Sequence, residues 1–302
     1  MKTSRLLEGL KARDPRAIGR AISLVENGDE SAEAILSALD ENLVSEAVII
    51  GITGPPGAGK STLTNSIISE LRQSGKRIGI IAIDPSSPIS GGAILGDRIR
   101  MMQHATDHDV VMRSMATRGR LGGLCATAGA AVRIMASSGC SFIIIETVGV
   151  GQSEMDIIRL ADITLLVLAP GLGDDIQAMK AGLLEVADIL VVNKADCKGA
   201  DILAMDLEAV TRKGNSTPTQ VSMTVATESK GIAELLDRID KLDSEHRDTG
   251  ERKTRRRAAH EQEVLDWCLE MLRPKLQAEI TKRELPLLGD PRLKAKKILE
   301  EQ

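Results

Sequence analysis

One glycine-rich segment has the residue types and the spacing of a phosphate-binding loop. Residues 54–61 read Gly-Pro-Pro-Gly-Ala-Gly-Lys-Ser, the complete pattern G-x-x-x-x-G-K-[ST]. In this pattern backbone N–H groups surround a phosphate chain, the lysine reaches the β- and γ-phosphates, and the serine hydroxyl binds Mg²⁺. The nucleotide-binding residues predicted here are Gly54, Pro55, Pro56, Gly57, Ala58, Gly59, Lys60, Ser61 and Thr62.

A second motif indicates which base is bound. Asn193, Lys194 and Asp196 follow an apolar run in the order N-K-x-D. The aspartate accepts two hydrogen bonds from guanine N1–H and N2–H₂, and adenine offers no such donor pair, so GTP is favoured over ATP. The alternative is an aspartate that caps a following helix. Ser222, near the last predicted strand, is a further nucleotide-binding candidate.

Three carboxylates are candidates for the magnesium site, together with Ser61. Glu146 closes the apolar run 142–145, Asp84 closes another, and Asp97 lies in a long glycine-rich connection. Carboxylate and hydroxyl oxygens are the ligands that Mg²⁺ prefers. Each carboxylate could instead be a structural cap. Gly149 is placed to donate its backbone N–H to the γ-phosphate.

The position that orients water in Ras-like enzymes holds no glutamine. Val150 follows Gly149, and Gln152 comes two residues later, so we predict slow intrinsic hydrolysis that a partner or a conformational change completes. Arg98, Arg118 and Lys180 are candidates for stabilising transition-state charge, and a surface salt bridge is an equal alternative for each. The predicted catalytic residues are Lys60, Glu146, Asp97 and Lys180.

The elements that position these residues form an alternating β/α pattern. Short apolar runs without period-2 alternation are typical of parallel strands that are covered on both faces. Separated by helical stretches, they predict an α/β fold with a doubly wound, mainly parallel sheet that binds its nucleotide at the strands' carboxyl ends. The runs are Val48–Ile52, Ile78–Ile83, Val110–Met112, Phe142–Ile145, Ile163–Leu168, Ile189–Val192 and one near Val221.

The pattern predicts three regions. Residues 1–45 carry apolar residues at helical spacing and predict two or three short helices ahead of the nucleotide-binding domain, residues 46–243. Residues 244–302 predict a helical arm that Pro274 should kink or split, and its apolar stripe needs a partner surface on the main domain or a second subunit. The arginine run 255–257 predicts a solvated helix face, with a docking patch as the less favoured alternative.

Composition excludes several classes of protein. A net charge of −4 gives no electrostatic reason for a nucleic-acid or membrane partner, and aromatic residues are only 1% of the chain. The four cysteines form no C-x-x-C pair, which argues against a zinc knuckle or a disulfide framework and favours a cytoplasmic location. His104 and His108 have metal-ligand spacing on a predicted helix, but a surface pair is the favoured interpretation.

Taken together, the motifs resemble the MeaB/ArgK family of SIMIBI-class P-loop GTPases, the chaperones of adenosylcobalamin-dependent methylmalonyl-CoA mutase. The resemblance spans about residues 5–242, and the last sixty or so match poorly. Besides the phosphate-binding loop and N-K-x-D, the matching segments are Asp-Pro-Ser-Ser-Pro (84–88), Gly-Gly-Ala-Ile-Leu-Gly-Asp-Arg (91–98), Arg-Ser-Met-Ala-Thr-Arg-Gly (113–119), Glu-Thr-Val-Gly-Val-Gly-Gln-Ser-Glu (146–154) and Gly-Asp-Asp-Ile-Gln-Ala-Met-Lys-Ala-Gly (173–182).

This resemblance implies a function that the residues alone do not show. It implies a Mg²⁺-dependent GTPase that gates cofactor loading and protects a cobalamin-dependent acyl-CoA mutase, either methylmalonyl-CoA mutase or a relative such as isobutyryl-CoA mutase. Segments 84–118 and 146–156 resemble switches I and II, and 171–188, which includes Lys180, resembles an extra switch that couples nucleotide state to the mutase. Family members are homodimers, and the C-terminal arm helps to pair their subunits.

Three alternative functions stay open. A kinase of an amino-acid (lysine/arginine/ornithine) transport system would need a phosphoacceptor site that the sequence does not display, and N-K-x-D disfavours ATP. A nickel-delivery GTPase would need a tract rich in cysteine or histidine, which is absent. A nucleotide-gated scaffold without turnover would differ from the main interpretation only in its rate of phosphate release.

Overall fold

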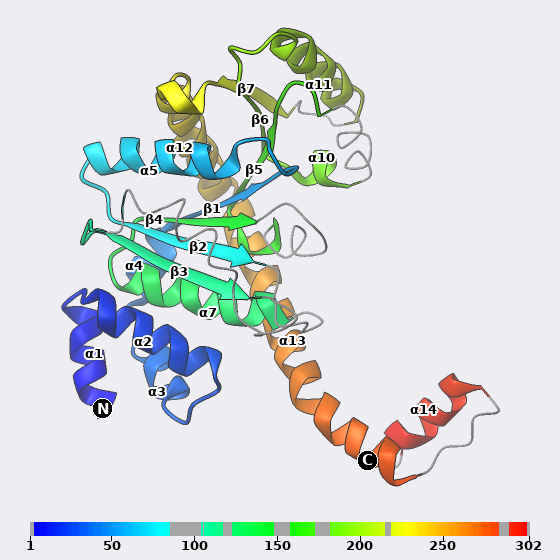
Figure 1. The fold of residues 1–302 in the computed structure, drawn as a ribbon. Helices are drawn as coiled ribbons and strands as arrows, with labels where there is room; N and C mark the ends of the chain where they lie inside the picture. The colour runs from blue at the N-terminus through cyan, green and yellow to red at the C-terminus, as the bar shows by residue number, and fades with distance from the viewer. Residues whose placement is uncertain are drawn as a thin grey trace.

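A seven-stranded sheet organises the molecule (Figure 1). The computed structural model describes residues 3–84, 104, 106–116, 123–147, 158–172, 182–214, 219–283 and 290–300. Every pair of neighbouring strands is parallel, in the order β3-β2-β4-β1-β5-β6-β7, which confirms the predicted fold class and all seven predicted strands. The strands are β1 (Val48–Thr53), β2 (Ile78–Asp84), β3 (Val110–Ala116), β4 (Phe142–Thr147), β5 (Ile163–Leu168), β6 (Ile189–Asn193) and β7 (Gln220–Thr224).

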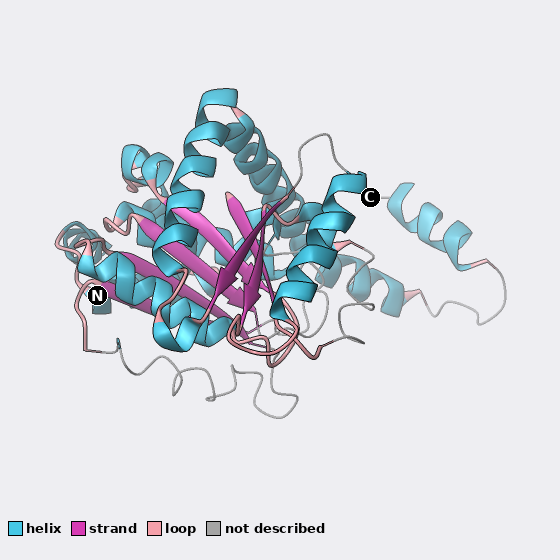
Figure 2. Ribbon diagram, turned by 90° about the horizontal axis from the view of Figure 1, so that it is seen from above, coloured by secondary structure: helices cyan, strands magenta, loops and turns pink. Residues whose placement is uncertain are grey.

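Helices cover both faces of the sheet, which explains the uninterrupted apolar runs (Figure 2). Every residue of β1, β4 and β5 is buried. Alternate side chains of β1 therefore enter different cores: Ile49 packs with the amino-terminal helices, and Ile50 and Ile52 pack with helices of the opposite face. One face is covered by α1 (Thr3–Lys11), α2 (Pro15–Glu26), α3 (Ala32–Ser37), α4 (Glu41–Glu46) and α7 (Gly123–Ser137); the other by α5 (Lys60–Gln73) and α12 (Ile232–Thr249). Beside β5 and β6, a third core includes residues of α10 (Leu183–Val186) and α11 (Ala200–Gly214).

The amino-terminal region holds four helices, rather than the two or three predicted. The additional boundary lies at Asp40, whose carboxylate accepts hydrogen bonds from the backbone N–H groups of Asn42 and Leu43. Such a cap starts a new helix, so α4 is a separate helix from α3. Similarly, Asp14 caps α2 by accepting from the N–H of Arg16.

The carboxyl-terminal arm is one long helix and a short one, α13 (Glu251–Lys282) and α14 (Pro291–Glu300). Of the two predicted effects of Pro274, a kink or a split, the split does not occur, because α13 continues through this residue. Residues around Pro274 are exposed, so solvent can hydrogen-bond the carbonyl group that loses its N–H partner. The far half of α13 extends away from the body of the molecule (Figure 1). None of the described helices is both long and apolar enough to cross a membrane.

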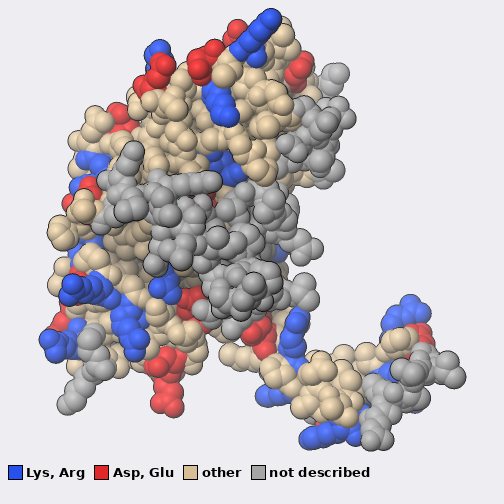
Figure 3. Space-filling model, in the orientation of Figure 1, with Lys and Arg blue, Asp and Glu red and all other residues tan. Residues whose placement is uncertain are grey.

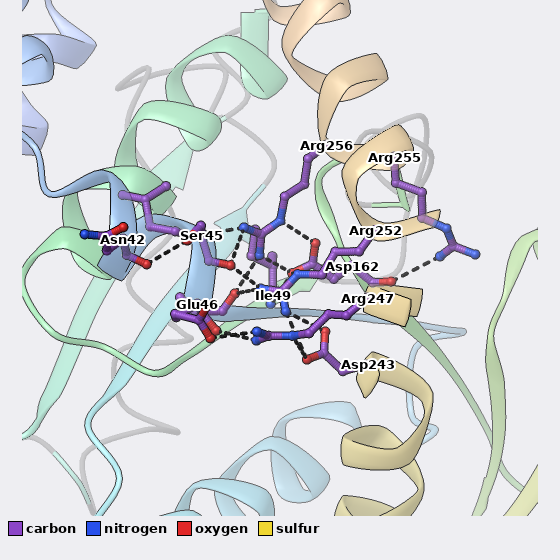
Figure 4. A network of polar contacts seen from close by, with 12 residues as sticks. Asn42, Ser45, Glu46, Ile49, Asp162, Asp243, Arg247, Arg252, Arg255 and Arg256 are labelled. Carbon is purple, nitrogen blue, oxygen red and sulfur yellow. Dashed lines mark hydrogen bonds and ion pairs between the residues drawn. The ribbon is translucent and has the colours of Figure 1, made fainter. Parts of the chain in front are cut away.

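Two of the three clustered arginines serve neither a solvated face nor a docking patch (Figure 4). Arg256 donates to both carboxylate oxygens of Asp162 at 2.7 and 2.6 Å and also to the carbonyl of Ala47 at 2.6 Å. Arg255 donates to both oxygens of Asp188 at 2.9 and 2.7 Å. Only Arg257 is exposed, and it pairs within its own helix. The predicted solvated face is therefore wrong for Arg255 and Arg256.

A third arginine of α13 is more deeply buried than Arg255 and Arg256. Arg252 is 4% exposed and donates to both oxygens of Asp243 on α12, and to the carbonyls of Ser45 and Ala47. Its burial lowers the pKa of Arg252, against the attraction of Asp162. For Arg255 the effect of burial is outweighed by the hydrogen bond and charge of Asp188, so its pKa is raised. Each of these arginines is paired with a carboxylate inside the fold, because a buried charge without a partner would be costly.

The network holds the amino ends of particular strands. Ala47 directly precedes β1, Asp162 precedes β5 and Asp188 precedes β6. Asp162 also accepts from the backbone N–H of Ile49 at 2.9 Å, which ties the start of β5 to the start of β1. We therefore call Arg252, Arg255 and Arg256 with their partners the strand-base network. It lies at the opposite ends of these strands from the nucleotide motifs, which follow the carboxyl ends.

Candidate functional site

The phosphate-binding loop connects β1 to α5 and depends on three glycines with positive φ. Gly54, Gly57 and Gly59 have φ values of 143°, 80° and 90°. A Cβ atom at Gly54 would lie 2.1 Å from the backbone oxygen of Val167, and one at Gly59 would lie 2.4 Å from the side-chain nitrogen of Asn193. The loop therefore packs directly against β5 and against the N-K-x-D segment, in a conformation that other residues rarely adopt.

Two alanine substitutions separate close packing from backbone conformation. Gly57→Ala meets nothing within 4 Å and should cost only the positive φ, about 1 kcal/mol. Gly54→Ala also has a positive φ, at 143° further from the left-handed helical region, and its Cβ collides with the backbone of Val167, so its cost should exceed that by several-fold. Urea unfolding of both variants measures the difference. Equal losses of unfolding free energy would contradict this account of the loop.

The lysine and serine of the motif lie at the start of α5. Lys60 is buried, and its Nζ donates to the carbonyls of Gly54 and Pro55 at 2.8 and 3.0 Å. The positive charge therefore lies within the loop itself. The amino end of α5 adds backbone N–H groups that have no acceptor within the helix and the positive end of the helix dipole, both of which favour a phosphate.

Strand register brings Glu146 to this helix end. β1 and β4 are neighbours, with Ile52 opposite Glu146. Glu146 is 6% exposed, and its two carboxylate oxygens accept from the Ser61 Oγ at 2.6 Å and from the Thr64 Oγ1 at 2.7 Å. A hydroxyl and a carboxylate at this separation are oxygen ligands of the kind that Mg²⁺ binds, so these residues fit the predicted metal.

Of the remaining magnesium and catalytic candidates, only the backbone of Asp84 belongs to the described part of the structure. Asp84 ends β2, which neighbours β4, but its side chain lies outside the described part of the structure. Outside the described residues lie Asp97, Arg98, Arg118, Gly149, Val150, Gln152 and Lys180. Their roles stay predictions. His108 lies in a turn ahead of β3, whereas His104 has 3-10 helical conformation and the residues on either side of it lie outside the described part of the chain. The described residues contain no group of three histidine, cysteine or carboxylate ligands.

Asn193, at the carboxyl end of β6, joins three segments. Its amide nitrogen donates to the carbonyl of Ala58 in the phosphate-binding loop at 3.0 Å. Its amide oxygen accepts from the Thr224 hydroxyl and the Ala226 backbone N–H, both at 3.2 Å. Lys194 has a positive φ of 57°, and its Nζ donates to the carbonyl of Gly57 at 2.8 Å. The N-K-x-D segment is thus fastened onto the phosphate-binding loop.

Asp196 lies beside this junction with its side chain exposed to solvent. The alternative role as a helix cap does not fit, because α11 begins at Ala200 and the residue directly before that helix is Gly199. A carboxylate that is exposed can accept hydrogen bonds from an incoming base. Its predicted role in recognising guanine therefore remains compatible with its position.

The predicted nucleotide-binding candidate Ser222 lies within β7 opposite Val191, with a buried hydroxyl. Three other residues of this region, Thr64, Thr224 and Ala226, were not identified from the sequence. Thr224 and Ala226, at and after the end of the same strand, instead contact Asn193. Thr64 holds Glu146 from the next turn of α5. Their position at the carboxyl edge of the sheet is the signal that could have identified Thr224 and Ala226.

Comparison with known proteins agrees with these features. Residues 18–281 match the model of the methylmalonyl-CoA mutase-associated GTPase MeaB. The chain belongs to the MeaB family of P-loop GTPases. A Pyrococcus abyssi relative of this MeaB-family chain is 48% identical over 289 residues, covering 92% of this chain and 88% of the relative. The match reaches residue 281, so the expected poor resemblance beyond residue 242 is wrong, and α13 lies almost entirely within the family pattern.

More distant relatives carry functional names. Escherichia coli GTPase ArgK is 34% identical over 241 residues, covering 76% of this chain and 72% of that protein. The mouse protein named methylmalonic aciduria type A homolog, mitochondrial, is 32% identical over 279 residues, which cover 85% of this chain and 66% of the mouse protein. The crystal structure of a protein named LAO/AO transport system kinase shares the fold of the MeaB-family chain, with a TM-score of 0.69 and 23% identity. The match covers 99% of this chain and 96% of the other.

Proposed function

We propose that this MeaB-family GTPase is a switch that gates adenosylcobalamin loading and protection of a cobalamin-dependent acyl-CoA mutase, with methylmalonyl-CoA mutase as the first candidate. The observation that carries the nucleotide part is the Ser61–Glu146 pair beside a glycine loop that Asn193 fastens in place. The mutase part is supported by the family's description and by the name of the mouse relative.

In this proposal each described residue has a defined task. Bound Mg²⁺ would neutralise charge on the β- and γ-phosphates of GTP. Lys60 turns its ammonium from the loop carbonyls toward the phosphates, and Ser61 and Glu146 hold the metal side of the site. Asp196 accepts the guanine N–H groups. The intrinsic hydrolysis rate is slow, because Val150 occupies the place of the water-orienting glutamine.

The arm supports a homodimer as the working assembly. Along α13 the exposed apolar side chains include Leu265, Leu269 and Leu272, which are 50%, 52% and 44% exposed. A stripe of this kind on a helix that leaves the body of the molecule suits a second subunit. Acidic and basic side chains are mixed on the face shown in Figure 3, consistent with a protein partner rather than a nucleic acid.

The alternatives have less support. The transport-kinase title belongs to a structure only 23% identical, which shows a shared fold. The nickel complex of Helicobacter pylori HypB is 15% identical to this chain, with a TM-score of 0.51, and likewise shows only a shared fold.

We propose the cytoplasm as the location of the protein. Cys140, Cys197 and Cys268 are free thiols, which suit a reducing compartment.

Nucleotide turnover tests the proposal directly. We expect the purified protein to hydrolyse GTP slowly, to hydrolyse it much faster with the host's cobalamin-dependent mutase, and to leave ATP unchanged. Removal of Mg²⁺ with EDTA should abolish turnover. Phosphate release under saturating mutase separates a true GTPase from a scaffold. Fast ATP turnover, or no response to any cobalamin-dependent mutase, would contradict the proposal.

A further inference from the structure

Thr64 occupies an unusual place for a polar side chain. It is fully buried on α5, next to Leu63 and one turn from Ile67 and Ile68, which are also fully buried. A buried hydroxyl needs a hydrogen-bond partner, and threonine is a poorer helix former than the apolar residues around it. Its Oγ1 donates to the Oε2 of Glu146 at 2.7 Å.

Helix spacing explains how Thr64 and Ser61 share one carboxylate. Residues three apart lie on the same side of a helix, so both hydroxyls face the end of β4. Ser61 binds one oxygen of Glu146 and Thr64 binds the other. The carboxylate is thus held at both ends, with Oε1 directed to the side of the motif serine.

We propose that Thr64 is a positioning residue for Glu146, and that it keeps the Glu146 carboxylate aimed at the magnesium site when Ser61 turns its hydroxyl to the metal. The inference rests on the proposed GTPase function. A glutamate side chain has one more rotatable bond than an aspartate side chain, so Glu146 has more conformations to lose when it is fixed. A fixed donor to Oε2 restricts that freedom.

The experiment compares nucleotide affinity with and without the metal. A fluorescent GTP analogue is titrated into the protein in Mg²⁺ and in excess EDTA. The dissociation constant in EDTA divided by the dissociation constant in Mg²⁺ gives the magnesium contribution, and this quotient is called the ratio below. Thr64→Val keeps the shape of the side chain and removes the donor. We expect the ratio to fall roughly tenfold or more, with the EDTA value unchanged. Thr64→Ser, which restores a hydroxyl, should recover most of the ratio.

Thr211→Val is the matched control. Thr211 is also buried on a helix, but its hydroxyl donates to the carbonyl of Glu208 in the same helix, α11. This variant should keep the wild-type ratio. Circular dichroism checks that each variant is folded, and if Thr64→Val is not, Thr64→Ala undergoes the same titration because it adds no bulk.

Each outcome is decisive. A Thr64→Val or Thr64→Ala protein with the wild-type ratio would overturn the inference and leave the GTPase intact. An equal loss in Mg²⁺ and EDTA would also overturn it, because it would show a structural effect on the loop. A wild-type protein that binds no GTP even in Mg²⁺ would instead refute the proposed function on which the inference rests.

Discussion

Replacing Asp162 by asparagine is expected to lower the free energy of unfolding by about 3 to 5 kcal/mol, because it breaks a buried ion pair from one side. Asp162 is 1% exposed and accepts from the Nε and Nη2 of Arg256, with the Nε of Arg252 3.6 Å away. Asparagine preserves the shape and can still accept from Ile49. It leaves two arginines with less counter-charge, one of them almost fully buried. Urea denaturation measures the loss.

Glu46→Gln is the control for this substitution. Glu46 also pairs with an arginine of the same region, Arg247, at 2.6 Å, but the Glu46 side chain is 70% exposed. Solvent and salt screen such a pair, so the midpoint of unfolding should not move. If Asp162→Asn were no more destabilising than Glu46→Gln, the strand-base network would not contribute to stability as described.

The second large effect concerns the base. Asp196→Asn should weaken GTP binding roughly 100-fold or more, because one acceptor oxygen of the pair that faces guanine N1–H and N2–H₂ becomes a donor. Xanthine carries an oxygen where guanine carries its amino group, so XTP should become the better ligand. Competition of GTP, XTP and ATP for a fluorescent nucleotide measures the change.

Asp201→Asn removes the same charge nearby without facing the base. Asp201 is exposed in the first turn of α11, shortly after the N-K-x-D segment. It should bind GTP as the wild type does. An Asp196→Asn protein that retained its preference for GTP over XTP would show that Asp196 does not recognise guanine.

The strands were predictable because their signal is local. A strand covered on both faces is a continuous apolar run, and all seven runs became strands of the sheet. Helix boundaries in the amino-terminal region were less predictable, because a single side chain decided them. Asp40 starts α4 as a separate helix by binding the N–H groups of Asn42 and Leu43.

The strand-base network had no local signal. Arg255 and Arg256 are adjacent in a charged segment, which is typical of a solvated helix face. Their partners Asp188 and Asp162 are 67 and 94 residues away in the chain. Only the three-dimensional arrangement brings them together, and pattern analysis within one window cannot detect that.

The candidate site divides in the same way. Lys60, Ser61 and Asn193 belong to motifs whose spacing carries their chemistry, so the sequence was sufficient to select them. Thr64 depends on the register of β4 against β1, and Thr224 depends on where β7 ends. These two threonines belong to no sequence motif. Until the three-dimensional position of its helix or strand is known, a threonine in the sequence predicts no specific contact.

The strand-base network also has a consequence for how the chain folds during synthesis. A growing chain emerges from its amino end, so β1, β5 and β6 are available before the arginines of α13 are. Until residue 256 has emerged, the carboxylate of Asp162 lacks the guanidinium groups that neutralise it in the finished protein. We expect the nucleotide-binding sheet to become stable only after the arginines of α13 have emerged. A chain that terminates early, even after β7, would then be recognised as unfinished by chaperones and proteases.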